Sequence, residues 1–255
     1  MEAMAIMESL FRWIHIAAGI MWIGHLYFFN FVNIPFQAVL EGPAKPKVNP
    51  ELIPRALFWF RWGALWTWIT GVLMLLLVFY HASGNLFEPG RTWGGGAILM
   101  IVVTFLAFFV YDALFKSPLG KDLKTGAAIG FALVIFIVLG FIHLGGFGYR
   151  GYVIHTGALF GTIMLMNVWM RIWPAQQKIL TAVKQGQAPD AALVALAGAR
   201  SRHNTYLSVP LVWMMIDQHT SVPFSNSPVF LFAMILVGWG AVYWLYGKSA
   251  TVKGF

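Results

Sequence analysis

Histidine is the residue type in this sequence that is best suited to chemistry, and most of its seven copies lie inside apolar stretches. His15 and His25 both fall in the run RWIHIAAGIMWIGHLYFF, and His143 and His155 flank the short segment GGFGYRG. A polar group in hydrocarbon costs roughly several kcal/mol unless it has a partner. Imidazole binds haem iron, copper and zinc. The histidines therefore predict a metal or a metal-containing cofactor inside the apolar part of the protein.

The elements that must position these histidines are predicted to be membrane-spanning helices. The chain has 255 residues, of which 59% are hydrophobic and 10% charged, whereas a soluble domain carries about 25% charged residues. Segments of sufficient length and apolarity to span a bilayer lie at about 10–33, 56–80, 94–115, 126–146, 151–173, 203–219 and 228–247. We therefore predict an all-α polytopic membrane protein with about seven transmembrane helices, forming a single domain over residues 1–255.

The basic residues predict the orientation. They gather in the loops after the first, third and fifth spans and at the C-terminus, whereas Arg12, Arg91 and Arg150 fall on the other side. The positive-inside rule then places the N-terminus outside and the C-terminus in the cytoplasm, in a bacterial-type cytoplasmic membrane. The loop 174–202 has helical periodicity and predicts amphipathic helices on the inner membrane face, with a mobile linker as the alternative. The net charge of +8 reflects these loops, so no nucleic-acid partner is predicted.

This topology sorts the histidines by depth. The histidines toward the outer side are His15, His81, His143, His155 and His219. His25 lies about 15 Å deeper than His15, at 1.5 Å per residue, and His203 lies at the inner start of the sixth span. For His81 an ordinary interfacial role is favoured. For His219 an interfacial role and a ligand role are equally favoured, since Asp217 nearby could orient its ring. His15, His25, His143 and His155 each lie within an apolar stretch and are better explained by a ligand.

Haem b is the cofactor that the sequence favours. The chain has no cysteine, which excludes thiolate metal sites and iron–sulfur clusters; zinc and copper remain as alternatives. Glycines such as Gly19 and Gly140 would let a flat macrocycle approach the backbone, although glycine also serves helix packing. Arg12 and Arg150 would hold the propionates, with lipid headgroups as the alternative partners.

The predicted ligand pairs follow from depth. His15 and His155 are the predicted axial ligands of an outer haem, with His143 or His219 as substitutes. His25 and His203 form a candidate inner pair for a second haem, with Arg200 and Arg202 available to its propionates.

Four longer strings resemble the N-terminal membrane domain of the membrane-bound urate oxidase (urate hydroxylase) family. They are RWIHIAAGIMWIG (12–24), VYDALFKSPLGK (110–121), YVIHTGALFGTIMLMNVWMRIWPAQQK (152–178) and GQAPDAALVALAGARSRHNTYLSVP (186–210). The resemblance implies a polytopic fold and urate oxidation that passes electrons to a C-terminal cytochrome c domain. It also implies that His15, His155, His203 and His219 stand at family histidine positions, and that Asn167, Asn204 and Tyr206 fall on matching motif positions.

The sequence also departs from this family. It has no CxxCH motif after the last span, so we expect a short member that lacks the cytochrome c domain and needs a separate electron partner. His25 and His143 stand out as additions, and the loop 34–55 is unlike that of the family.

Three functions are compatible with these observations. The first is a haem-b redox protein that carries electrons from a small reductant or a quinol to an external cytochrome c, or within a respiratory complex. The second is an enzyme, an oxidoreductase that hydroxylates urate. Groups that could hydrogen-bond a purine are Asn167, Asn204, Tyr206, Asp217 and Gln218, although they do not lie at one depth. The third is a cofactor-free transporter or structural membrane subunit, for which Asp112 is the candidate proton carrier, with an ion pair to Lys116 as the favoured explanation.

Overall fold

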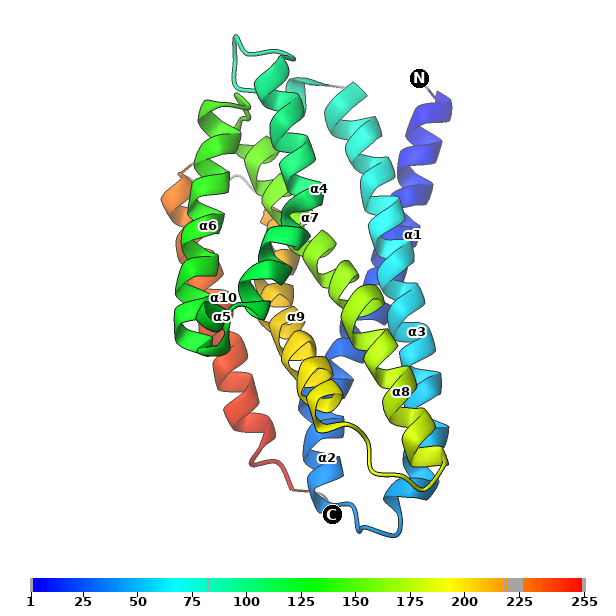
Figure 1. Cartoon of the computed structure of the whole chain (residues 1–255). Helices are drawn as coiled ribbons and strands as arrows, with labels where there is room; N and C mark the ends of the chain where they lie inside the picture. The colour runs from blue at the N-terminus through cyan, green and yellow to red at the C-terminus, as the bar shows by residue number, and fades with distance from the viewer. Residues whose placement is uncertain (1, 82, 218, 220–226, 254–255) are drawn as a thin grey trace. The chain divides into compact units, whose positions relative to one another are not determined.

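The computed structural model describes residues 2–81, 83–217, 219 and 227–253. Within these residues the regular structure is helical, apart from an isolated β-bridge between Phe87 and Phe147. The helices are α1 (Glu2–Tyr27), η1 (Phe28–Asn33), α2 (Ile34–Val39), α3 (Lys45–Met74), η2 (Leu75–His81), η3 (Ser83–Asn85), α4 (Gly95–Lys116), α5 (Pro118–Lys121), α6 (Leu123–His143), α7 (Tyr149–Asn167), η4 (Val168–Ile172), α8 (Trp173–Lys184), α9 (Ala191–Asp217) and α10 (Pro228–Ser249) (Figure 1). The predicted all-α class is confirmed.

Six continuous helical stretches in the described chain are long and apolar enough to cross a membrane. They are Glu2–Val39, Lys45–His81, Gly95–Lys116, Leu123–His143, Tyr149–Lys184 and Pro228–Ser249. The protein is therefore a multi-pass membrane protein. The predicted span 203–219 falls largely in α9, which is helical but too polar to join these six, because Arg200, Arg202, His203 and Asn204 share its N-terminal half. A seventh span and the orientation stay predictions.

The segment 174–202 differs from the predicted loop. It is helical as expected, but residues 174–184 continue the fifth span as α8, and residues 191–202 begin α9. Gly186, with φ +70°, follows the end of α8, and the Asp190 carboxylate accepts a hydrogen bond from the Ala192 amide at the start of α9. A glycine in the left-handed region after one helix and an N-capping aspartate before the next confine the break to residues 185–190.

Two prolines inside long helices are accommodated by π-helical turns. Pro35 follows η1 and Pro174 follows η4, each at one of the first positions of the next α-helix. Proline lacks an N–H and collides with the carbonyl of the preceding turn in a regular α-helix. A wider π-turn relieves that conflict, so both helices continue through their prolines.

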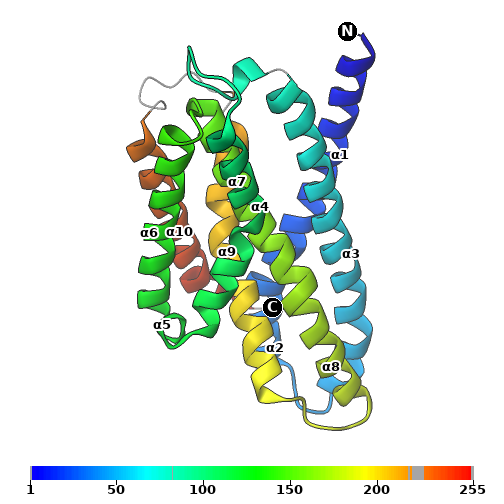
Figure 2. The same cartoon turned by 45° about the horizontal axis from the view of Figure 1, so that its top comes forward.

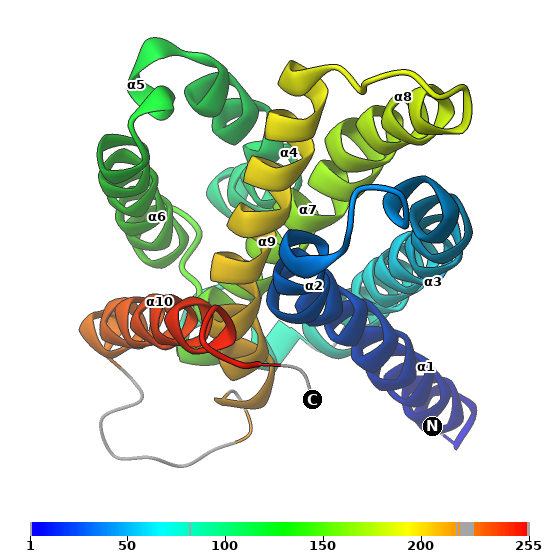
Figure 3. The ribbon, with the colours of Figure 1, turned by 90° about the horizontal axis from the view of Figure 1, so that it is seen from below.

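The chain divides into two compact units. The first unit comprises residues 1–8, 72–163 and 210–237, and the second comprises 9–71, 164–209 and 238–255. In the first unit, α4 and α6 pack side by side and α5 connects them (Figure 2). In the second, α1 and α8 both lie against α3, as the view from below shows (Figure 3).

The contact between α1 and α3 depends on Gly63. A Cβ atom at this position would lie 3.1 Å from the Trp22 amide nitrogen and 3.2 Å from the Ala18 carbonyl oxygen. Both neighbours are backbone atoms of α1, which a side-chain rotation cannot move. The two helices therefore approach as closely as they do because residue 63 has no side chain.

Gly63→Ala is expected to destabilise the protein by about 1–3 kcal/mol, because the added methyl forces α1 away from α3. The thermal unfolding of the detergent-solubilised protein measures the effect. Gly24→Ala is the matched control, since a Cβ atom at Gly24 would meet nothing within 4 Å. Equal unfolding temperatures for the two variants would contradict the close-contact role of Gly63.

Candidate functional site

His155 is completely buried in α7 of the first unit, at 0% exposure. Its Nδ1 lies 2.7 Å from the Gly151 carbonyl oxygen, and its Nε2 lies 2.9 Å from the Tyr80 hydroxyl. A carbonyl oxygen only accepts hydrogen bonds, so Nδ1 must carry the proton. Nε2 of the neutral ring is then the acceptor, and it faces the Tyr80 hydroxyl. The fold has selected one tautomer of this imidazole.

Aromatic rings enclose the His155 imidazole. Its centroid lies 4.7 Å from that of Phe147 and 5.7 Å from those of Phe141 and Tyr80. Phe141 and Phe147 are stacked on each other, and Trp93 packs edge-on against Tyr80 at 5.8 Å. The imidazole therefore sits in an apolar surrounding in which the Tyr80 hydroxyl is its side-chain hydrogen-bond partner.

The glycines of GGFGYRG let the loop before α4 close over the start of α7. The Gly148 amide donates to the Leu86 carbonyl, and the Glu88 amide donates to the Gly146 carbonyl. A Cβ atom at Gly151 would lie 2.2 Å from the Leu86 oxygen. The absence of side chains at these glycines lets the two backbone segments lie in direct contact. Likewise the space beside Gly140, assigned from sequence to a macrocycle, is filled by the side chain of Met100.

His15 is half-buried in α1 of the second unit and is oriented by α3. Its Nδ1 lies 2.8 Å from the Thr67 carbonyl oxygen and 3.3 Å from the Thr70 hydroxyl. The Thr70 hydroxyl itself donates to the Trp66 carbonyl. Nδ1 of His15 is thus the proton donor to Thr67, and Nε2 is left as the acceptor nitrogen. A Cβ atom at Gly71 would lie 3.1 Å from Cε1 of this ring, so glycine there makes room for the imidazole.

The remaining histidines divide between the units. His25, like His15, holds Nδ1 against a backbone carbonyl oxygen, that of Met21 in its own helix, at 2.7 Å. His203 is half-buried in α9 of the second unit, whereas His143 and His219 are exposed in the first. His15 belongs to the second unit and His155 to the first, and their pairing stays a prediction. The pairing of His25 with His203, which both belong to the second unit, also stays a prediction.

Among the residues that the structure describes, no group of three or more histidine, aspartate or glutamate side chains could hold a metal ion. Zinc and copper sites usually take three or four protein ligands, whereas haem iron takes one or two axial side chains. The haem prediction and its zinc and copper alternatives therefore stay predictions.

The two arginines predicted to serve propionates occupy different settings. Arg150 is exposed, and its guanidinium donates to the Asn85 side-chain oxygen at 3.1 Å. Asn85 in turn donates to the Val78 carbonyl, so Arg150 is tied to the end of η2. Arg12 is half-buried in α1, nearly one turn before His15. Neither position tests the propionate role, which stays a prediction.

Residues 40–251 match a protein-family model described as urate oxidase N-terminal. The match covers well over half of the 255 residues. The chain belongs to the urate oxidase N-terminal family. No curated protein and no solved structure matches it. The resemblance found in the sequence is thereby confirmed. His155 and His203 lie inside the matched range of this urate oxidase N-terminal family member, and His15 and His25 lie before it.

The amides that the family resemblance singled out meet inside the second unit. Asn167 and Asn204 are both 0% exposed. The Asn167 amide donates to the Asn204 side-chain oxygen at 2.8 Å, and Asn204 donates to the Met164 carbonyl at 2.9 Å. Tyr206 stacks on Tyr246 at 6.0 Å. Three of the purine-binding candidates therefore belong to the second unit of this urate oxidase N-terminal protein.

The other two candidates do not join them. Asp217 is buried in the first unit, where its carboxylate accepts a hydrogen bond from Tyr149. Gln218 lies outside the described residues. Asp112 forms the predicted ion pair with Lys116, at 2.7 Å. Its interfacial position and its alternative role as a proton carrier stay predictions.

Sequence reasoning missed Tyr80, which contacts His155, and Asn30, whose partner Tyr246 stacks on Tyr206. Tyr80 ends an apolar run, where an aromatic residue normally indicates an interface, and nothing in the run points to His155. Asn30 is 2% exposed; it donates to the Leu26 carbonyl and the Ser201 hydroxyl and accepts from the Tyr246 hydroxyl. A single asparagine in the run FFNFV was the available signal for Asn30.

Proposed function

We propose that this protein is a membrane-embedded redox component of urate oxidation, which takes electrons from urate and passes them through haem b to a separate cytochrome c or another membrane subunit. A quinol is the alternative electron donor, and the bacterial-type cytoplasmic membrane is the proposed location. Membership of the urate oxidase N-terminal family supports urate as the substrate. The redox part of the proposal depends on three histidines that share one hydrogen-bonding pattern.

His15, His25 and His155 each hold Nδ1–H against a backbone carbonyl oxygen, at 2.7–2.8 Å. A histidine that ligates haem iron is a neutral imidazole that almost always donates its second N–H to an acceptor, which fixes the ring and raises its basicity. His15 and His25 meet this requirement directly. At His155 the acceptor nitrogen Nε2 faces the Tyr80 hydroxyl, so His155 would hold haem iron only if that hydroxyl moved away. These three Nδ1–H hydrogen bonds support the haem proposal.

The cofactor and the residues of the chain would have separate roles. Haem b, when bound, supplies one-electron chemistry at its iron. The carbonyl groups of Thr67 and Gly151 hold the imidazoles in the ligating tautomer. Hydroxylation of urate by water releases two electrons and two protons, and a planar purine with several polar edges requires hydrogen-bonding partners. Asn167, Asn204 and Tyr206 are the candidates for that recognition.

An optical spectrum of the detergent-purified protein, reduced with dithionite minus oxidised, tests the proposal, together with a pyridine haemochrome assay for haem per chain. We expect a sharp low-spin b-type spectrum with one haem, or two if the inner pair also binds. Anaerobic urate should then reduce the same haem, and added cytochrome c should reoxidise it. A colourless protein would overturn the haem assignment. A haem that dithionite reduces but urate does not would overturn the choice of substrate.

A further inference from the structure

Arg61 lies in an aromatic cage in the second unit. Its Cζ atom is 3.9 Å from the ring centroid of Trp173, 5.6 Å from that of Trp169 and 5.9 Å from that of Phe58. The indole N–H of Trp169 also donates to the Arg61 backbone carbonyl at 3.2 Å, which fixes the junction between α3 and the turn η4. Aromatic faces attract a guanidinium through their quadrupoles, so the cage holds the cation in one place.

The N–H groups of this guanidinium make no hydrogen bond to the part of the protein that the structure describes. Its Nε atom is buried. The carboxylates of the second unit, Glu41, Glu51 and Asp190, are all exposed, and Glu51 is engaged by Arg55 at 2.6 Å. The ring of Trp173 lies nearest the guanidinium, 3.9 Å from Cζ. A guanidinium packed on an aromatic ring keeps its forked N–H donors for a partner such as an oxyanion.

The position of Arg61 along the helix corresponds to a membrane interface. After Arg61 the chain carries no charged residue from 62 to 80, a helical length of about 28 Å that matches the roughly 30 Å hydrocarbon core. The fifth span has the same charge pattern, because residues 151–170 contain no Asp, Glu, Lys or Arg and Arg171 follows them. Arg61 and its tryptophan neighbours thus lie where both apolar runs end.

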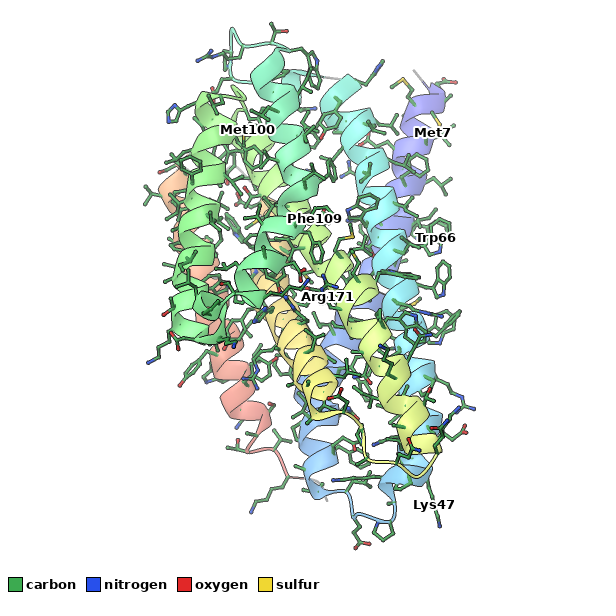
Figure 4. All side chains as sticks on the ribbon, viewed as in Figure 1. Met7, Lys47, Trp66, Met100, Phe109 and Arg171 are labelled. Carbon is green, nitrogen blue, oxygen red and sulfur yellow. The ribbon has the colours of Figure 1, made fainter. Side chains whose placement is uncertain are left out.

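The side chains around the cage are those of an interfacial belt. Trp59 is 50% exposed and Trp66 is 51% exposed, and Trp66 projects outward from α3 (Figure 4). Phe58 itself is 44% exposed. Tryptophan is enriched at the level of the lipid headgroups. An oxyanion that reaches Arg61 at this level is most simply a headgroup phosphate.

We propose that Arg61, caged by Trp169 and Trp173, binds the phosphate group of an anionic phospholipid such as phosphatidylglycerol. The lipid phosphate accepts hydrogen bonds from the edge of the guanidinium, while the acyl chains lie along the exposed aromatic face of α3. This site is independent of the haem and urate assignments, because it uses none of their residues.

Native mass spectrometry of the detergent-purified full chain tests the site by titration with phosphatidylglycerol or phosphatidylcholine. We expect the protein to bind phosphatidylglycerol in preference, and Arg61→Gln to weaken that binding about fivefold, the effect of one basic residue near an anionic headgroup. Arg55→Gln is the matched control on the same helix, since Arg55 is paired with Glu51. Trp173→Leu should weaken binding while keeping the charge, and Arg61→Lys should restore only part of it.

Thermal unfolding of each variant without added lipid distinguishes a folding defect from a binding defect. If Arg61→Gln does not fold, Trp173→Leu provides the test of the site. Equal phosphatidylglycerol affinity in the Arg61→Gln, Trp173→Leu and wild-type proteins would overturn the proposal. Inorganic phosphate and glycerol phosphate should bind far more weakly than the lipid. If either competes as well as phosphatidylglycerol at the same concentration, the site takes a free phosphate and the lipid assignment is wrong.

Discussion

His155→Ala is expected to remove the b-type spectrum and urate-dependent reduction together, with haem binding weakened at least about tenfold. The reason is local. His155 is the histidine that the structure buries completely, and its tautomer is fixed by the Gly151 carbonyl. His155→Met is the informative companion, because a thioether in place of one imidazole keeps haem ligated but raises its potential. Haem per chain and the midpoint potential are the two measurements.

Tyr80→Phe and His81→Ala make the result specific to ligation. Tyr80→Phe removes the hydroxyl from which Nε2 of His155 accepts a hydrogen bond. Because Nε2 is then free for iron, haem content should be maintained or increased. His81 is exposed at the end of η2, and His81→Ala should leave the spectrum unchanged. If His155→Ala lowered only the unfolding temperature, and His155→Met left the midpoint potential unchanged, His155 would be a packing residue whose hydrogen bond to Tyr80 is structural.

The helices were predictable from the sequence because each long apolar run carries its own signal. Helix α9 shows the limit of that reasoning. Its N-terminal half contains Arg200, which is 2% exposed, together with Asn204 and Thr205, each 0% exposed. A helix that buries its polar residues in the protein interior has the hydropathy of a surface helix, so composition underestimates how deeply α9 is packed. Of these residues, Arg200 belongs to the predicted loop 174–202, whereas Asn204 and Thr205 belong to the predicted span 203–219.

The candidate site was predictable as a set of residue types and not as a set of contacts. Burial in apolar runs identified His15 and His155, but their partners Thr67 and Tyr80 lie 52 and 75 residues away along the chain. Glycines were misleading for the same reason. The sequence shows that a side chain is missing at Gly151 or Gly140, but only the fold shows what fills the space, which is the Leu86 carbonyl in one case and Met100 in the other.

Gly71→Ala is expected to perturb the haem that His15 is proposed to hold, without removing the proposed ligand. The new methyl would lie 3.1 Å from Cε1 and 3.4 Å from Nδ1 of the imidazole, which is tighter than an ordinary van der Waals contact. The ring must turn or shift, and the Nδ1–H bond to the Thr67 carbonyl, 2.8 Å long, must lengthen. Weakening the hydrogen bond that orients a metal-bound imidazole typically costs about 10–100-fold in metal affinity or activity. Redox titration of the haem and pyridine haemochrome stoichiometry measure the two effects.

Gly19→Ala provides the comparison, because its methyl would meet Thr67 at 3.7 Å, an ordinary contact on the same face of α1. We expect Gly19→Ala to keep the wild-type midpoint potential, Gly71→Ala to shift it, and His15→Ala to abolish the signal of that haem. A Gly71→Ala protein with unaltered potential and haem content would show that His15 does not ligate iron. The Thr67 and Thr70 contacts would then be the whole explanation for a histidine between α1 and α3, and the search for the ligand would pass to His25, whose Nδ1–H bond is to its own helix.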